Sequence, residues 1–128
     1  MLQIKLTSIM VEDQAKALAF YTEILGFQKQ MDFPVGEYRW ITVAAAGRDD
    51  LQLALEPNVN PAAKAFQQAM FAQRIPLASF ETTDLDAEYA RLAGKGVAFT
   101  KPPTAAGPVK VAVFSDTVGN LIQLHQPV

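Results

Sequence analysis

The side chains able to do chemistry are few, and the missing types restrict the possible reactions. The 128 residues include no cysteine and one histidine, His125. Thiolate nucleophiles, disulfides, cysteine-based metal sites and multi-histidine zinc sites are therefore excluded. No serine stands at a recognisable spacing from His125, so the sequence predicts no serine nucleophile. The glycines are isolated turn residues and do not form a phosphate-binding loop.

Two glutamates and the histidine are the remaining candidates for an unusual metal site. Glu56, Glu81 and His125 each fall on a predicted strand, toward the end where solvent is near. Acidic side chains in such places are mostly solvated, so rim charges are the favoured interpretation. A metal site built from the three stays open as the alternative.

Charge and length exclude several classes of partner. Eleven basic and thirteen acidic residues are spread along the chain and give a net charge of −2, so no basic stripe for nucleic acid is expected. Apolar runs fall far short of the ~20 residues that cross a bilayer. With half of its residues hydrophobic, the chain has enough apolar surface for one core. A soluble cytoplasmic protein is expected.

Periodicity predicts a strand, a helix and three more strands in the first half of the chain. Asp13 caps the helix and Gly26 ends it. The predicted strands cover residues 2–11, 27–33, 38–45 and 51–56. A connecting helix follows over about 60–73, with Asn60 as cap and Pro61 in its first turn.

The second half repeats this order. Asp84 caps a helix that Gly96 ends, and strands are predicted at 77–82, 97–100, 109–115 and 121–126. The proline-rich stretch 101–108 is interpreted as a loop and a candidate lid. An offset of 71 residues superimposes the two halves, pairing Leu6 with Leu77, Ser8 with Ser79, Asp13 with Asp84 and Gln52 with Gln123. One offset that fits strand, cap and last strand indicates an internal repeat of two β-α-β-β-β modules.

Three segments carry a family resemblance over nearly the whole chain. They read VED at 11–13, AFYTEILGF at 19–27 and DTVGNLIQL at 116–124. Together with the repeat, they resemble the vicinal oxygen chelate superfamily of glyoxalase I, bleomycin resistance proteins and extradiol dioxygenases. Thr117 stands where that family usually has proline. The resemblance implies an α+β fold in which the two modules form a cupped sheet with helices outside, and a homodimer. The whole chain, 1–128, is expected to be one domain, with module 1 at about 2–57, the linker helix at about 60–73 and module 2 at about 75–127.

The resemblance also implies where a metal would bind. Catalytic relatives hold a divalent metal on four inward side chains, and the matching positions here are Leu6, Gln52, Leu77 and Gln123. Leucine has no donor atom, and glutamine offers only a neutral amide oxygen, which is a poor ligand for a transition metal. The usual metal site is therefore predicted to be absent, and no cofactor is expected.

The floor of such a cup would mix apolar and polar side chains, as small-molecule sites do. Arg39 and Trp40 are neighbours on one strand, so only one of them can face the cup, and the sequence leaves open which one. Two inward glutamines favour a hydrated or ligand-filled cavity over a packed one. The predicted ligand-binding residues are Leu6, Ser8, Phe33, Arg39, Trp40, Gln52, Leu77, Ser79 and Gln123.

The favoured function is a metal-free protein, similar to the bleomycin-resistance branch, that binds a small, partly aromatic molecule. Relatives that bind cationic drugs tend to be more acidic than this chain, which counts against a close match. The first alternative is a lyase, isomerase or dioxygenase with non-standard metal ligands. The second is a module whose cup is filled by its own side chains and whose role is protein contact.

Overall fold

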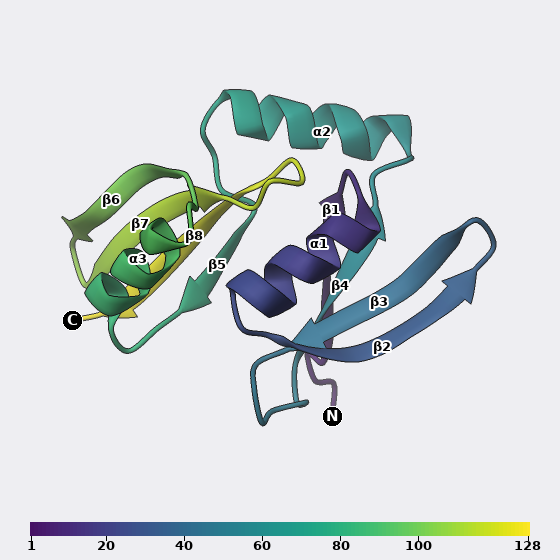
Figure 1. Cartoon of the computed structure of the whole chain (residues 1–128), viewed down its shortest axis with the longest axis horizontal. Helices are drawn as coiled ribbons and strands as arrows, with labels where there is room; N and C mark the ends of the chain where they lie inside the picture. The colour runs from purple at the N-terminus through teal and green to yellow at the C-terminus, as the bar shows by residue number, and fades with distance from the viewer. The chain divides into compact units, whose positions relative to one another are not determined.

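The computed structural model describes all residues from Met1 to Val128. The chain divides into two compact units, Met1–Phe66 and Gln67–Val128, and each is described by itself. Each unit contains one four-stranded sheet (Figure 1).

The first unit is a β-α-β-β-β module. Its elements are β1 (Leu6–Val11), α1 (Gln14–Ala19), η1 (Phe20–Ile24), β2 (Gln28–Val35), β3 (Tyr38–Ala44) and β4 (Gln52–Pro57). The strands are ordered β1-β4-β3-β2, with β1 parallel to β4 and the other pairs antiparallel. Helix α1 packs against β3 and β4 (Figure 1). The core includes Val11, Tyr21, Ile41 and Leu55, all of them buried.

The helix expected to run from Asp13 to Gly26 changes its winding halfway. It begins as predicted, with the Asp13 carboxylate accepting a hydrogen bond from the amide of Lys16 at 3.0 Å. From Phe20 it continues as η1, a π-helical turn, where the Leu25 amide donates to the Phe20 carbonyl five residues back. The Thr22 hydroxyl bonds the Leu18 carbonyl at 2.7 Å, a side-chain bond that competes with regular α-helical pairing.

The second unit repeats the module after the connecting helix. Helix α2 (Pro61–Ala72) crosses the boundary between the units and is followed by β5 (Ala78–Glu81), α3 (Leu85–Gly94), β6 (Phe99–Ala106), β7 (Val109–Ser115) and β8 (Leu121–Pro127). The strand order β5-β8-β7-β6 is that of the first sheet, again with one parallel pair, β5 with β8. Leu85, Leu92, Phe114 and Ile122 are buried in this unit. The α+β class and the two β-α-β-β-β modules are thus confirmed, while the single domain over 1–128 stays a prediction.

The predicted loop at 101–108 is wrong. Strand β6 runs through this stretch and pairs with β7, and only the turn at Gly107 separates the two strands. Because β6 lies at the edge of its sheet, Pro102 and Pro103 can occupy it without breaking the pairing of an inner strand. For the same reason Pro34 lies inside the other edge strand, β2, which extends two residues beyond the predicted end at 33. The candidate lid is therefore part of a sheet.

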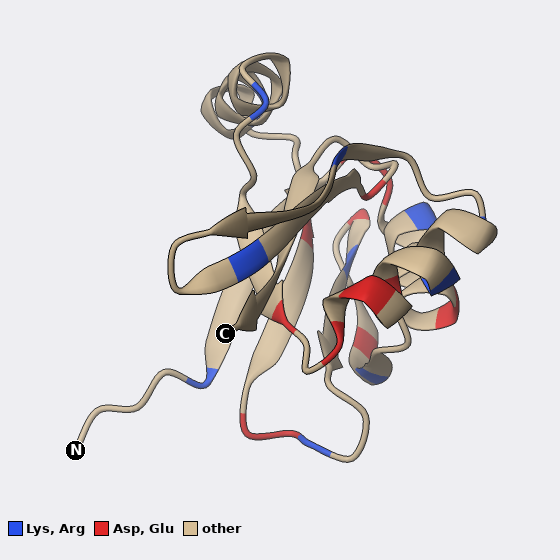
Figure 2. Ribbon diagram, turned by 90° about the vertical axis from the view of Figure 1, so that its left-hand side faces the viewer, with Lys and Arg blue, Asp and Glu red and all other residues tan.

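Charged residues of both signs are distributed along the chain. Lys and Arg stand singly among Asp and Glu along the ribbon (Figure 2). The helices are too short or too polar for any of them to cross a bilayer.

Candidate ligand-binding site

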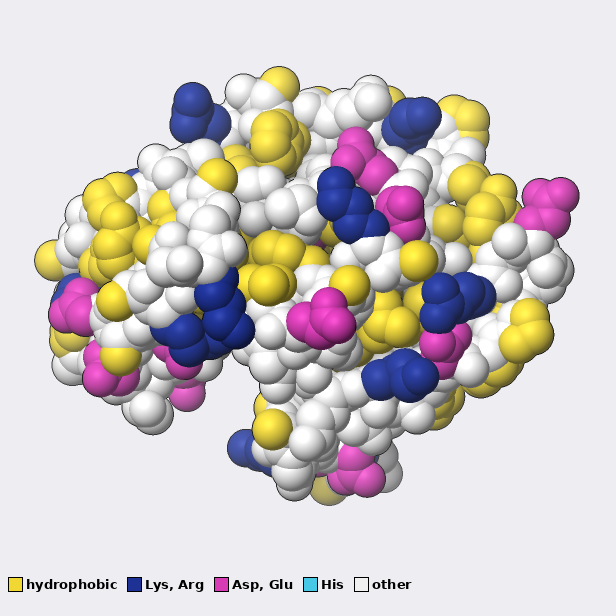
Figure 3. All heavy atoms as spheres, in the orientation of Figure 1, with side chains coloured by type: hydrophobic (Ala, Val, Ile, Leu, Met, Phe, Trp, Pro, Cys, Tyr) yellow, Lys and Arg dark blue, Asp and Glu magenta, His cyan; other side chains and the backbone are white.

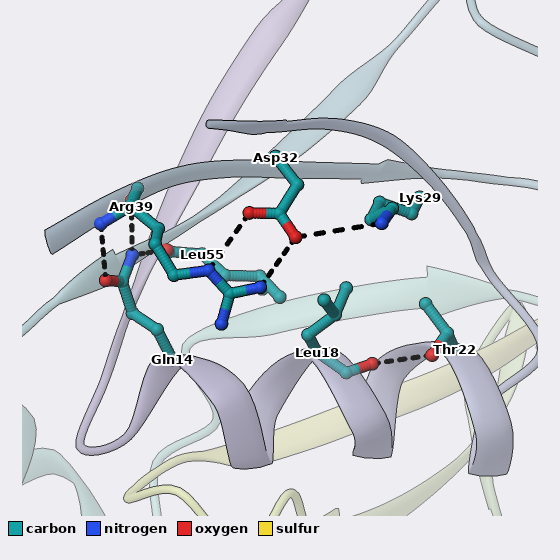
Figure 4. A network of polar contacts seen from close by, with 7 residues as sticks. All are labelled: Gln14, Leu18, Thr22, Lys29, Asp32, Arg39 and Leu55. Carbon is teal, nitrogen blue, oxygen red and sulfur yellow. Dashed lines mark hydrogen bonds and ion pairs between the residues drawn. The ribbon is translucent and has the colours of Figure 1, made fainter. Parts of the chain in front are cut away.

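The face of the first sheet opposite α1 gathers most of the predicted ligand-binding side chains. The Arg39 side chain lies between β3 and α1 (Figure 4), and strand residues alternate between faces, so Trp40 and Thr42 lie on the side away from the helix. Strand register then extends this set across the sheet, pairing Leu6 with Gln52, Ser8 with Ala54 and Phe33 with Trp40. We call this surface the face opposite α1. Of the predicted first-sheet residues, it carries all except Arg39.

Arg39 lies on the helix side, which decides between it and Trp40. Its guanidinium donates two hydrogen bonds to the Asp32 carboxylate, at 2.6 and 3.0 Å (Figure 4). This pairing holds the pKa of Asp32 below its usual range. The side chain of Gln14 on α1 bonds both the amide and the carbonyl of Arg39 and also the Leu55 carbonyl, which fixes the helix to β3 and β4. The predicted ligand role of Arg39 therefore does not fit its position, because its hydrogen-bonding groups already hold the module together.

Large apolar side chains on the face opposite α1 remain accessible. Phe33 is 48% exposed, Leu6 47% and Tyr38 41%, and Trp40 is half-buried. Figure 3 views the molecule from the α1 side, where hydrophobic side chains lie at the surface among charged ones, so the face opposite α1 is behind it. Exposed aromatic groups that lie together on one sheet face are suited to stacking on a planar molecule.

A polar pair lies beneath this apolar surface. The hydroxyl of Thr42, which is fully buried, donates to Gln52 Oε1 at 2.7 Å. This bond satisfies the buried hydroxyl and leaves the Gln52 amide group as a hydrogen-bond donor. Inward glutamines therefore need no ligand here, because Gln52 has a partner within the protein and no buried side-chain nitrogen or oxygen lacks one.

The face of the second sheet opposite α3 carries a connected row of polar side chains. Gln123 Nε2 donates to Ser79 Oγ at 3.0 Å, and Ser79 Oγ lies 2.6 Å from His125 Nδ1. The other ring nitrogen of His125 lies 3.5 Å from Glu81 Oε1. No serine stands at a recognisable spacing from His125 in the sequence, yet the structure brings Ser79 within hydrogen-bond distance of it. Parallel pairing of β5 with β8 joins residues that are 46 positions apart, a relation that local spacing does not reveal.

The positions that match the family's metal ligands do not suit a metal. In the first sheet, Leu6 lies directly opposite Gln52. In the second sheet, the corresponding Leu77 and Gln123 are not opposite each other: Gln123 lies opposite Ser79, and the Leu77 amide donates to the Leu121 carbonyl. Two leucines contribute no donor atoms, and the two glutamines already hydrogen-bond to hydroxyls. No group of three or more His, Asp or Glu side chains is arranged to hold a metal ion. Of the non-standard candidates, only Glu81 and His125 meet, and Glu56 belongs to the other sheet.

Comparisons with known proteins agree with this architecture. The model of the Glyoxalase/Bleomycin resistance protein/Dioxygenase superfamily matches residues 3–124. The YurT protein of Bacillus subtilis (strain 168) is 51% identical over 126 residues, which cover 98% of this chain and 99% of that protein. The crystal structure of TnmS3, an antibiotic binding protein from Streptomyces sp. CB03234, superimposes with a TM-score of 0.80. The two sequences are 35% identical, and the match covers 100% of this chain and 98% of the TnmS3 chain.

A second crystal structure, that of UcmS2, is 30% identical, covers 98% of both chains and has a TM-score of 0.85. The family model and the YurT match each span nearly the whole chain, including both modules. The chain therefore belongs to the glyoxalase/bleomycin resistance protein/dioxygenase superfamily.

Proposed function

We propose that this protein binds a small, partly aromatic molecule without a metal, using the face opposite α1. The observation that carries the proposal is the position of Phe33 and Trp40, which are directly opposite each other on neighbouring strands and share that face. Cross-strand aromatic pairs provide a flat apolar surface. The Gln52 amide adds a hydrogen-bond donor that can orient the ligand.

The remaining predicted residues fit this role to different degrees. Leu6 and Ser8 extend the surface along β1, next to Gln52 on β4. Leu77, Ser79 and Gln123 are the second module's counterparts and remain predicted ligand contacts. Arg39 is left out of the proposed site, because its guanidinium is paired with Asp32 on the helix side.

Two lines support binding over metal-dependent catalysis. The four positions that hold the metal in catalytic relatives offer no charged or imidazole donor in this chain, and such donors are what divalent transition metals require. TnmS3, which shares the fold at 35% identity, is an antibiotic binding protein. This similarity favours a small organic ligand for the present chain as well.

Trp40 is the only tryptophan, and its fluorescence provides the test. A panel of planar aromatic compounds, beginning with 1-anilinonaphthalene-8-sulfonate and naphthols, is titrated into the full chain with and without EDTA. We expect saturable quenching by at least one compound at one site per chain, unaffected by the chelator. A panel in which no compound changes the Trp40 signal, or binding that EDTA abolishes, would contradict the proposal.

A matched pair of variants distinguishes binding at this site from nonspecific hydrophobic binding. Phe33 and Phe66 are 48% and 49% exposed, but Phe66 lies on α2 and not on a sheet. Covering half of the roughly 200 Å² of a phenylalanine contributes at most about 2.5 kcal/mol at ~25 cal/mol per Å². Phe33→Ala should therefore weaken binding about 10- to 50-fold, and Phe66→Ala should leave it unchanged. Equal losses in both variants would place the ligand elsewhere.

The homodimer and the cytoplasmic location are part of the same proposal. Size-exclusion chromatography with light scattering tests the first, with a mass of twice 14.0 kDa expected. A role in protein contact, with no small ligand, is the competing outcome of the fluorescence screen.

A further inference from the structure

The row of polar side chains on the second sheet, Gln123, Ser79, His125 and Glu81, has the composition of a catalytic group. We propose that Ser79 is a nucleophile, activated by His125, that accepts the acyl group of small activated carboxylic esters such as phenyl esters. Nothing in this proposal depends on the ligand face of the first sheet or on a metal.

The geometry contains the three parts that an activated serine requires. The nucleophile Ser79 Oγ lies 2.6 Å from His125 Nδ1, within the range over which a base takes a proton. A third group, Glu81, stands 3.5 Å from the opposite ring nitrogen, on the side of the ring where the orienting carboxylate of a catalytic triad stands. Ser79 is exposed, so an ester can reach its oxygen.

The neighbours of the histidine favour one of its two neutral tautomers. If Nδ1 carried it, the bare Nε2 would face the Glu81 carboxylate, and two acceptors would oppose each other. With the proton on Nε2, the ring donates toward Glu81 and its Nδ1 accepts from the Ser79 hydroxyl. Gln123 Nε2 donates to the same oxygen and leaves the serine proton directed at His125. This arrangement has the serine as donor and the histidine as base, as the reaction requires.

The reaction balances without a co-reactant other than water. Ser79 Oγ forms a bond to the ester carbonyl carbon while its proton moves to His125 Nδ1. The bond from that carbon to the leaving oxygen then breaks, and His125 returns the proton to the departing phenol. In the second half, water attacks the acyl-serine, its proton passes through His125 to Oγ, and the carboxylic acid leaves.

The test uses the full chain and a fluorophosphonate reagent, which transfers its phosphonyl group to activated serine hydroxyls and releases fluoride. Intact mass gives the stoichiometry, and tryptic mapping gives the position. Cleavage after lysine and arginine places Ser79 in peptide 75–91, Ser8 in 6–16 and His125 in 111–128. Ser8, the exposed repeat counterpart of Ser79, lies opposite Ala54 and serves as an internal control without a histidine.

We expect one label per chain, on peptide 75–91 and not on 6–16. His125→Gln should slow labelling about 100-fold or more, since general-base catalysis contributes roughly 10²- to 10⁴-fold. Glu81→Gln should slow it less, about tenfold or below, because an exposed carboxylate 3.5 Å away acts through a screened interaction. Thr104→Val removes another exposed hydroxyl on the same sheet and should have no effect. p-Nitrophenyl acetate should give a burst of one p-nitrophenolate per chain.

Three results would overturn the proposal: no labelling of the wild-type chain, a label on peptide 6–16 or 111–128, or an unchanged rate in a folded His125→Gln variant. Thermal melting establishes that the variants are folded. If His125→Gln does not fold, the location of the label in the wild-type chain still decides the question.

Discussion

A buried network of hydrogen bonds centred on Asp116 holds the turn between β7 and β8. Asp116 is fully buried, and its Oδ1 accepts hydrogen bonds from the amides of Val118 and Asn120, both at 3.0 Å. Its Oδ2 accepts from Asn120 Nδ2 at 2.8 Å, and Asn120 Oδ1 in turn accepts from Gln67 Nε2 at 3.0 Å. One carboxylate therefore sets the direction of a chain of hydrogen bonds that reaches α2.

Replacing Asp116 with alanine would remove the acceptor for three buried donors. A buried donor left without its partner costs about 1–3 kcal/mol, and water entering the vacated space offsets part of this cost. We expect Asp116→Ala to lower the free energy of unfolding by about 3–5 kcal/mol, which is large for a single substitution.

Asp116→Asn is the matched control because it keeps the size and one acceptor oxygen. That oxygen can still accept from the two backbone amides, but the new NH₂ group would face Asn120 Nδ2. The Asn120 amide must then reverse, which breaks its bond from Gln67. The expected loss is about 1–2 kcal/mol, one to two ordinary hydrogen bonds.

Urea denaturation at 25 °C followed by far-ultraviolet circular dichroism measures both losses. Trp40 fluorescence is unsuited, because Trp40 lies in the first unit and the network in the second. With a slope of about 2 kcal/mol per M, the midpoint of Asp116→Ala should fall by roughly 1.5–2.5 M. A loss below about 1 kcal/mol, or an equal loss in Asp116→Asn, would refute the reasoning that these bonds cannot be replaced.

Three further predictions concern the backbone and the first unit. Thr117 has a φ of 67°, which is unfavourable for a β-branched residue, so Thr117→Gly should raise the free energy of unfolding by about 0.5–1 kcal/mol. Thr117→Pro should lower it by about 2 kcal/mol or more, because proline cannot adopt this φ and has no amide hydrogen to donate to Ser115 Oγ. Asp32 has a lowered pKa in the folded protein, so it stabilises the fold at pH values above its ordinary pKa of 3.8, and this contribution is lost as the pH falls through the lower folded pKa. The urea midpoints of the wild type and Asp32→Asn should therefore differ at pH 7 and converge at strongly acidic pH. A difference that grows in acid would show that the sign assigned to this effect is wrong. Gln14→Ala should cost about 1–3 kcal/mol, measured as a lower melting temperature, because the Arg39 amide and carbonyl lose their side-chain partner; an unchanged melting temperature would show that water replaces it.

The resemblance of the turn sequence to its family has a physical basis in this network. The aspartate and the asparagine of the segment 116–120 are the residues whose side chains hold the turn closed. The position between them that usually carries proline in the family has a left-handed backbone here, which proline cannot adopt. The sequence identified the motif, and the structure shows that its aspartate and asparagine hold the turn.

Features that depend on neighbours in the chain were predictable from the sequence. Asp13 and Asp84 each cap a helix by a hydrogen bond to an amide three residues on, and Gly26 and Gly96 end these helical segments with φ values of 90° and 86°. The repeat of the module order followed from the same local signals. Such signals act within one turn of helix or one strand, so the sequence contains all the information they need.

Features that depend on strand pairing were decided only by the tertiary structure. Register between distant segments decides three of these features. They are the edge strand formed by the proline-rich stretch, the choice of Arg39 or Trp40 for the helix side, and the meeting of Ser79 with His125. A shift of one residue in register would reverse the face of every side chain in a strand. The sequence alone therefore determined the modules, their caps and the unsuitability of the metal positions, while packing across the sheets determined which side chains meet on each face.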